Sequence, residues 1–227
     1  MRHADHLPAL PQDDLDLVAE LDREWVATRP FLPPDDVVDS ADRFVERLRG
    51  MPPRESCLRI SPAEHAEDPT VFAWGLQPGL LDLAENYIGL PVRYLGVEVK
   101  REVPYAPEHR EDVLRDWHND FEDRRMLKVI VYLSDVDVES GPFEYLDRRH
   151  TERHRLTGPR FTAVYADTSR VLHRVMAPVA AERYSMTFAY ASTALFYAYP
   201  HFMLPRTALT RVSEQLSTRQ QRALTMA

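Results

Sequence analysis

The chain has 227 residues, of which 44% are hydrophobic and 28% are charged, as in an ordinary globular protein with one sizeable core. A formal net charge of −8 argues against nucleic acid as the main partner, because phosphate binding needs a basic surface. The longest clean apolar run, residues 129–133, is too short to span a membrane, so we expect no membrane partner.

The first 90 residues are expected to be mainly helical, because apolar side chains recur there at helical spacing between proline and glycine breaks. In chain order we expect a loose arm over residues 1–14 that contains His3 and His6, a helix over 13–28, a short helix from the cap Ser40 to Leu48, a loop over 51–70, and a helix over 79–88 closed by Gly89.

From residue 92 onward the pattern favours β-structure, with short runs of β-branched and aromatic residues separated by polar, proline or glycine breaks. The expected strands are 92–103, 127–133, 143–146, 161–165, 170–176 and 183–190. The polar tail over 207–224 is expected to be a C-terminal helix. Several short strands after a helical preface indicate a mostly β fold, a sandwich or barrel with flanking helices.

One short motif, Trp117-His118-Asn119-Asp120-Phe121, carries the strongest chemical signal. Residues two apart on a strand share one face, so His118 and Asp120 could act together. Imidazole and carboxylate suit Fe(II), Mn(II) or Zn(II), and a second histidine from elsewhere would complete a 2-His-1-carboxylate triad with open coordination positions. Alone the motif is a weak signal, since a surface His–Asp pair is the commoner reason for it.

A second segment offers that histidine. If residues 170–176 and 183–190 fold as an antiparallel pair about Pro178, His173 falls opposite Arg183, and Ser185 shares the same face. A guanidinium can hold a carboxylate through two parallel hydrogen bonds. The expected ligand is a small molecule that chelates a metal at one end and carries a carboxylate at the other.

These pieces together resemble the non-haem Fe(II)/2-oxoglutarate-dependent dioxygenases, in particular the phytanoyl-CoA dioxygenase and ectoine hydroxylase group. The matching stretches are WHNDFE at 117–122, MLKVIVYL at 126–133, GPFEYL at 141–146, DTSRVLHR at 167–174 and Arg183-x-Ser185. One departure is the sequence DRRH at 147–150, where such proteins often have a Pro-Gly-Ser-His turn.

The resemblance implies a double-stranded β-helix, the cupin-like jelly roll, in a single oxygenase domain over 1–227. Its core would span 91–200, and residues 201–227 would form the C-terminal helix. By the same resemblance His118, Asp120 and His173 are the Fe(II) ligands, and Arg183, helped by Ser185, holds the distal carboxylate of 2-oxoglutarate. O2 is then the second cosubstrate.

The activity implied is hydroxylation of an unactivated C–H bond in a small molecule, with secondary metabolism as the expected setting. The expected oligomeric state is a monomer or a homodimer. Related halogenases replace the carboxylate ligand by a small residue, whereas Asp120 is present here. Desaturation, epimerisation and cyclisation stay open, and so do two other classes: a non-catalytic metal- or ligand-binding jelly roll, and a Zn or Mn cupin-type enzyme that does not use O2.

Several residues near the motif have two interpretations. Lys128 and Tyr132 share one face of their strand, which either lines the pocket or faces solvent. Of Arg124 and Arg125 at most one can enter the pocket, and a surface charge cluster is the simpler expectation. His150 and His154 would share a helix face, but the polar surroundings favour a solvated loop.

The expected compartment is the cytoplasm. The single cysteine, Cys57, excludes an intrachain disulfide framework, and the N-terminal residues contain no apolar stretch of the kind found in signal peptides.

Overall fold

The computed structural model describes residues 6–53, 55–104, 116–197 and 202–224, so the predicted position of His3 lies outside the described residues. The helices are α1 (Gln12–Glu24), α2 (Asp35–Gly50), α3 (Pro62–Glu67), α4 (Thr70–Trp74), α5 (Pro78–Ile88), α6 (Arg206–Ser213) and α7 (Thr218–Leu224). The strands are β1 (Val26–Pro30), β2 (Cys57–Arg59), β3 (Val92–Glu102), β4 (Met126–Tyr132), β5 (Phe143–Leu146), β6 (Arg153–Leu156), β7 (Thr162–Ala166), β8 (His173–Val175) and β9 (Arg183–Ser192).

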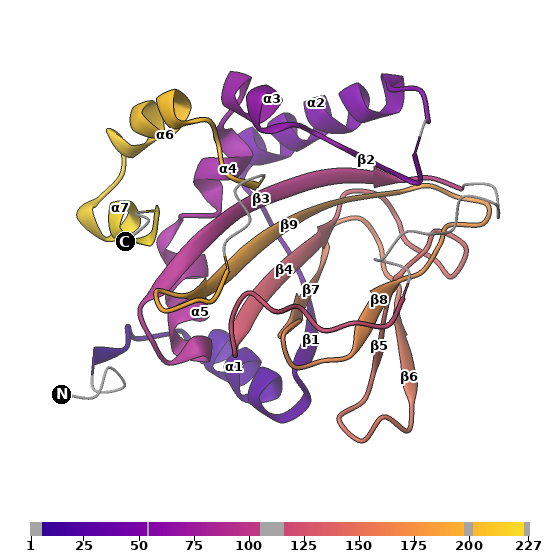
Figure 1. Ribbon diagram of the computed structural model, residues 1–227, viewed down its shortest axis with the longest axis horizontal. Coiled ribbons are helices and arrows are strands. Elements are labelled where there is room, and N and C mark those ends of the chain that lie inside the picture. Colours follow the sequence, from indigo (N-terminus) through magenta and orange to yellow (C-terminus); the bar gives the residue numbers. More distant parts are fainter. Residues whose placement is uncertain (1–5, 54, 105–115, 198–201, 225–227) are drawn as a thin grey trace.

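The strands form two antiparallel sheets, and this arrangement with its flanking helices confirms the predicted jelly roll (Figure 1). The larger sheet has the order β1-β7-β4-β9-β3-β2, and the smaller has the order β6-β5-β8. An isolated bridge between His118 and His173 continues the smaller sheet beyond β8 by one residue pair. The segment that carries the His-x-Asp motif is thereby attached to the smaller sheet.

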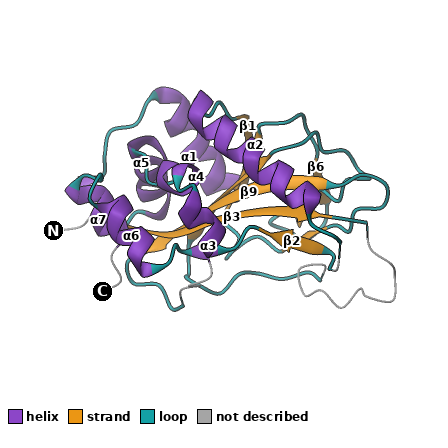
Figure 2. Cartoon of the chain, turned by 90° about the horizontal axis from the view of Figure 1, so that it is seen from above, coloured by secondary structure: helices purple, strands orange, loops and turns teal. Residues whose placement is uncertain are grey.

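Helices cover one face of the larger sheet, and α2 lies over β3 and β9 when the chain is seen from above (Figure 2). Side chains alternate along β9, so Tyr184, Met186 and Phe188 join the main hydrophobic core. Arg183 and Ser185 have the opposite parity and lie on the other face of the strand. The chemistry-bearing side chains of β9 therefore lie on the face away from this main core.

The N-terminal elements differ from the predictions in their bounds. The predicted helix over 13–28 ends at Glu24, because Trp25 takes a left-handed conformation with φ 66° and the chain then enters β1, which pairs with β7. Apolar residues in β1 continued the spacing of the helix, so periodicity alone could not detect the change. The helix over 79–88 is confirmed as α5, which ends at Gly89 in the left-handed region.

Three further expectations were wrong. Ser40 is not a cap: α2 begins at Asp35, and the buried Ser40 hydroxyl donates to Asp68. The loop expected over 51–70 contains β2 and α3 and leads into α4. The single C-terminal helix is two, α6 and α7, and the chain between them follows no regular helix.

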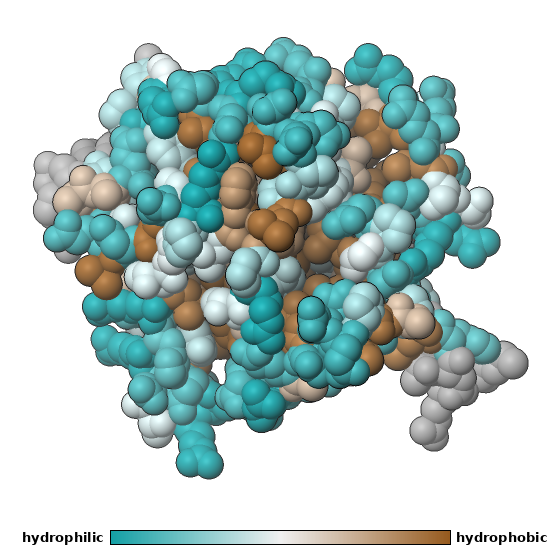
Figure 3. All heavy atoms as spheres, turned by 180° about the vertical axis from the view of Figure 1, so that it is seen from behind, coloured by the Kyte–Doolittle hydropathy of each residue, from teal (hydrophilic) through white to brown (hydrophobic). Residues whose placement is uncertain are grey.

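One face of the molecule is mainly polar. Hydrophilic residues cover most of the face seen from behind, with hydrophobic residues scattered among them (Figure 3). None of the described helices combines the length and apolar character needed to cross a membrane.

Candidate metal centre

The backbone places His118 and His173 directly opposite each other. The amide of each histidine donates to the carbonyl of the other, at 3.0 Å in both directions, as in a hydrogen-bonded antiparallel pair. Their rings therefore lie on the same side of the sheet, with centroids 4.4 Å apart. Around the motif this one residue pair has β-bridge geometry, and it brings the two imidazoles together.

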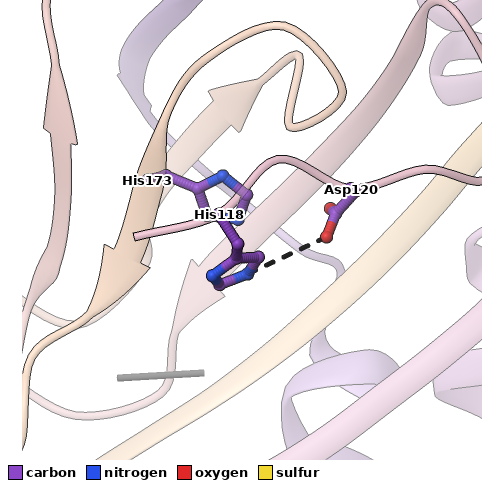
Figure 4. Close-up of side chains that lie close together, drawn as sticks. All are labelled: His118, Asp120 and His173. Atoms are coloured by element: carbon purple, nitrogen blue, oxygen red, sulfur yellow. Dashed lines mark ion pairs between the residues drawn. The ribbon is translucent and has the colours of Figure 1, made fainter. Parts of the chain in front are cut away.

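Asp120 completes the cluster from the irregular segment that follows. Its amide donates to the carbonyl of Thr168 at 2.8 Å, which fixes the backbone beside the chain that leads to His173. One donor atom from each of the three side chains lies within 4.8 Å of the others. Figure 4 shows the three side chains converging, with His118 Nε2 3.9 Å from Asp120 Oδ1.

The donor set fits a divalent metal ion. His118 Nδ1 lies 2.8 Å from the carbonyl of Asp116, and His173 Nδ1 lies 3.0 Å from the carbonyl of Val171. Each Nδ1 therefore carries the proton and donates it, which leaves Nε2 as the metal-binding atom. Burial lowers the pKa of His173 to about 4, although Asp120 opposes the shift, so this imidazole is neutral at neutral pH.

The three side chains line a cavity of about 440 Å³ between the sheets. Charged and polar residues make one part of its wall: Arg59, Glu98, Lys100, Glu122, Lys128, Thr168 and Thr187. Apolar side chains make the rest: Ile130, Phe143, Val175 and Phe202. A cavity of this size with convergent polar groups is typical of small-molecule sites.

Lys128 faces this cavity, which decides between the two interpretations of its strand face. Its Nζ lies 2.6 Å from Asp120 Oδ2 and 3.9 Å from Glu122 Oε1. Burial pushes the pKa of Asp120 upward, but Lys128 and His173 outweigh it and hold that pKa below its ordinary value. Burial likewise disfavours the ammonium of Lys128, but Asp120 and Glu122 raise its pKa overall, so the pair is ionised.

The predicted pairing of His173 with Arg183 is wrong. His173 in β8 pairs with Tyr145 of β5, whereas Arg183 in β9 pairs with Glu102 of β3. Strands that follow each other in a jelly roll can enter opposite sheets, so the short turn at Pro178 links the sheets instead of closing a hairpin.

Arg183 is nevertheless buried on the inner face of the larger sheet. Its Nη1 donates to the carbonyl of Gly141, and its Nη2 lies 3.6 Å from Glu102 Oε1. Gly141 has φ 72°, and a Cβ there would collide with the carbonyl of Met176, so this turn requires glycine. Among the described residues, neither Arg183 Nε nor the Oγ of the fully buried Ser185 has a hydrogen-bond partner.

A row of alternating charges crosses the inner face from the edge strand to Arg183. The distances are 2.6 Å for Arg59–Glu98, 3.3 Å for Lys100–Glu98, 3.3 Å for Lys100–Glu102, and the 3.6 Å from Glu102 to Arg183. Lys100 lies opposite Ser185 in the register and lines the cavity. Sequence reasoning missed Lys100, although the charges two residues apart in Glu98-Val-Lys100-Arg-Glu102 indicated a charged strand face.

The other ambiguous residues lie outside the cavity wall. Tyr132 is buried, and its hydroxyl donates to the carbonyl of Leu156 at 2.6 Å. Arg124 lies over Phe196, while Arg125 lies over Tyr87 and forms an ion pair with Asp22. Both arginines thus pair near the surface, as the simpler expectation had it.

The segment around His150 and His154 is not a loop throughout. His150 lies in a turn with φ 58°, whereas His154 belongs to β6 and stacks on Tyr145 with ring centroids 4.9 Å apart. The two histidines therefore share no helix face.

Comparison with solved structures relates this fold to known enzymes. The epimerase SnoN from nogalamycin biosynthesis, described as non-heme and alpha-ketoglutarate-dependent, is 20% identical over 84% of this chain and 87% of its own, with a TM-score of 0.61. HygX from Streptomyces hygroscopicus, with nickel, 2-oxoglutarate and hygromycin B bound, is 19% identical over 83% and 89%, with a TM-score of 0.58. EctD from S. alaskensis with bound Fe is 14% identical over 87% and 86%, with a TM-score of 0.62.

No family model and no curated protein sequence matches the chain. At these identities the structural matches establish the shared fold. The chain therefore has the double-stranded β-helix fold of Fe/2-oxoglutarate-dependent enzymes over most of its length.

Proposed function

We propose that the protein is an Fe(II)/2-oxoglutarate-dependent oxygenase that hydroxylates an unactivated C–H bond of a small molecule. The observation that carries the proposal is the convergence of His118, Asp120 and His173, with donor atoms within 4.8 Å of one another, in a cavity of about 440 Å³. Enzymes with the same fold hold iron or nickel and 2-oxoglutarate. Two imidazoles and one carboxylate are the ligand set of the facial triad.

In this proposal His118 and His173 bind the ferrous ion through Nε2, and Asp120 binds it through a carboxylate oxygen. The iron, when bound, supplies activation of O2 coupled to oxidative decarboxylation of 2-oxoglutarate. The hydrogen bonds of each Nδ1 to a backbone carbonyl keep the imidazoles turned toward the ion.

The distal carboxylate of 2-oxoglutarate is assigned to Arg183 and Ser185. Both are buried, and each has a donor atom without a partner among the described residues, Nε in one case and Oγ in the other. A buried donor left unpaired costs free energy, so a ligand carboxylate would satisfy both. Lys100 lies opposite Ser185 in the register, but its charge is balanced by Glu98 and Glu102, so we assign it no part in holding this carboxylate.

Hydroxylation is the proposed outcome because Asp120 supplies the carboxylate that halogenases lack. Ile130, Phe143 and Val175 would hold the apolar part of the substrate and exclude water from the reacting C–H bond. The epimerase among the structural matches indicates that this fold also supports another outcome. The monomeric or homodimeric state and the cytoplasmic location stay predictions from the sequence.

The test compares the purified protein with Asp120→Ala and with Asp39→Ala, which removes an exposed carboxylate of α2 that does not line the cavity. With Fe(II) and 2-oxoglutarate under anaerobic conditions, the native protein and Asp39→Ala should show a weak visible charge-transfer band. In air both should form succinate, faster once the substrate is supplied. Asp120→Ala should show neither signal, and unchanged succinate formation in this variant would refute the assignment.

The same experiment separates the other two classes. A binding protein would show the band but no O2 uptake or succinate over a panel of substrates. A Zn or Mn cupin-type enzyme would carry one of those metals when freshly purified, and its activity would depend neither on 2-oxoglutarate nor on Arg183.

A further inference from the structure

We propose that Lys128 holds Asp120 in a one-oxygen metal-binding mode, so that Lys128 is a positioning residue that keeps a coordination position open and moderates metal affinity. This inference rests on the metal centre of the proposed function. It concerns a lysine on the strand after the His-x-Asp motif, which the sequence left undecided between pocket and solvent.

The two oxygens of Asp120 have different neighbours. Oδ2 lies 2.6 Å from Lys128 Nζ, a short charge-assisted hydrogen bond. Oδ1 lies 3.9 Å from His118 Nε2, one of the imidazole nitrogens that face the metal position. One oxygen is thus directed to Lys128 and the other to His118.

Both partners are held in place by the fold. Lys128 lies on the inner strand β4, where its cross-strand neighbours are two buried alanines, Ala166 and Ala189. Such small neighbours leave room for the lysine side chain to extend across the sheet face. Asp120 is fixed by its amide hydrogen bond to Thr168. The side chains of Lys128 and Asp120 are only 17% and 13% exposed, so water screens the pair weakly.

This contact matters because the number of ligand positions is limited. Three protein ligand atoms would leave open positions on a bound ion for 2-oxoglutarate and O2. An Asp120 that bound through both oxygens would take one of these open positions. The hydrogen bond from Lys128 occupies Oδ2 and so opposes that mode.

The ammonium group of Lys128 should also lower the affinity of the site for a divalent metal ion. Two positive species close together in a poorly hydrated site repel each other, and the charge of Lys128 cancels that of Asp120. Removal of the charge should therefore tighten divalent metal binding. A lysine with a merely structural role would give the opposite sign, because loss of local order weakens metal binding.

The test is titration of the metal-stripped full-length protein with Co2+, followed by calorimetry and by the visible spectrum of the bound ion. Lys128→Met removes the charge and the donor, Lys128→Gln removes the charge but keeps an N–H donor on a shorter side chain, and Lys128→Arg keeps both the charge and the donor. Lys100→Met is the matched control, since Lys100 lines the same cavity but pairs with Glu98 and Glu102.

We expect Lys128→Met and Lys128→Gln to bind Co2+ about tenfold tighter than the native protein, and Lys128→Arg and Lys100→Met to stay within about threefold. In Lys128→Met, 2-oxoglutarate should change the cobalt spectrum less, because Asp120 then uses both oxygens. Lys128→Gln should keep more of the native response to 2-oxoglutarate than Lys128→Met, since it retains an N–H donor on the side of Oδ2.

The inference is overturned if Lys128→Met or Lys128→Gln, folded by circular dichroism, binds Co2+ no more tightly than Lys100→Met. If Lys128→Met does not fold, Lys128→Gln alone decides the question. Failure of the proposed function gives a different result: the native protein would then bind Co2+ no better than Asp120→Ala or His173→Ala.

Discussion

His65 makes the stability of the protein depend on pH in a way that can be measured. This histidine lies in α3 and is 3% exposed, and neither ring nitrogen has a hydrogen-bond partner among the described residues. Its ring meets the edge of Phe44, with centroids 4.8 Å apart. A protonated imidazole in this position would be a buried charge without a hydrogen bond.

Burial lowers the pKa of His65 from 6.5 to about 4, although Glu64 and Asp68 oppose the shift. The unfolded chain binds a proton at His65 below pH 6.5, whereas the folded chain does so only near pH 4. Stability from this group is therefore complete above pH 6.5 and is lost as the pH falls toward 4. Between pH 7 and pH 5 the linkage relation gives a loss of about 2 kcal/mol.

Urea unfolding at pH 7 and pH 5, on the native protein and on His65→Leu, measures this contribution. The fall in the free energy of unfolding between the two pH values should be about 2 kcal/mol smaller in His65→Leu. Other titrating groups, such as His173, are common to both proteins and cancel in the comparison.

The reasoning is refuted if the native protein and His65→Leu lose the same stability between pH 7 and pH 5, within about 0.5 kcal/mol. That result would mean that the folded protein accommodates the protonated ring, through water or a local opening of α3.

Two further substitutions test the binding site and its support. Arg183→Met should raise the 2-oxoglutarate concentration that half-saturates the charge-transfer band by roughly 10- to 100-fold, because charge-assisted hydrogen bonds are lost, and Arg183→Lys should raise it less. An unchanged half-saturation point would contradict the assignment. Tyr87→Phe removes the 2.6 Å hydrogen bond to buried Asp167, which precedes the Thr168 carbonyl that fixes Asp120. It should cost about 1.5–3 kcal/mol of unfolding free energy in urea, and a loss below about 0.5 kcal/mol would argue against this support role.

Elements with a clear local signal could be predicted from the sequence. The strand over 143–146 has the predicted bounds, and β3 ends within one residue of its prediction, because β-branched and aromatic runs there are bounded by glycine and proline. The helix α5 carried an end signal, Gly89, and its predicted start lies one residue after the observed start at Pro78. The jelly roll followed from these strands together with the family resemblance.

Short polar strands gave no such signal. Strand β2 is Cys-Leu-Arg, and β6 is Arg-His-Arg-Leu at the edge of the smaller sheet. Edge strands expose side chains and need little apolar pattern, so their residues looked like loop. The pairing between distant strands could not be predicted either. No residue near Pro178 indicates that β9, the strand after the turn, belongs to the other sheet than β8.

The sequence could not show on which face of its strand the Lys128 side chain lies, for a different reason. Strand β4 is Met-Leu-Lys-Val-Ile-Val-Tyr, with apolar residues of both parities, because the helices cover one face and the smaller sheet lies against the other. A strand buried on both faces shows no alternation from which an inner face could be identified.

The reciprocal backbone bond between His118 and His173 bears on the energetics of ion capture. His118 and His173 cannot separate unless both backbone hydrogen bonds break, so their donor atoms stay near one another before an ion arrives. An incoming cation would then meet a preorganised pair and would lose little affinity to conformational entropy. In the reverse direction, a bound ion would clamp the motif segment to the smaller sheet, and amide exchange at these two residues should slow when the site is filled.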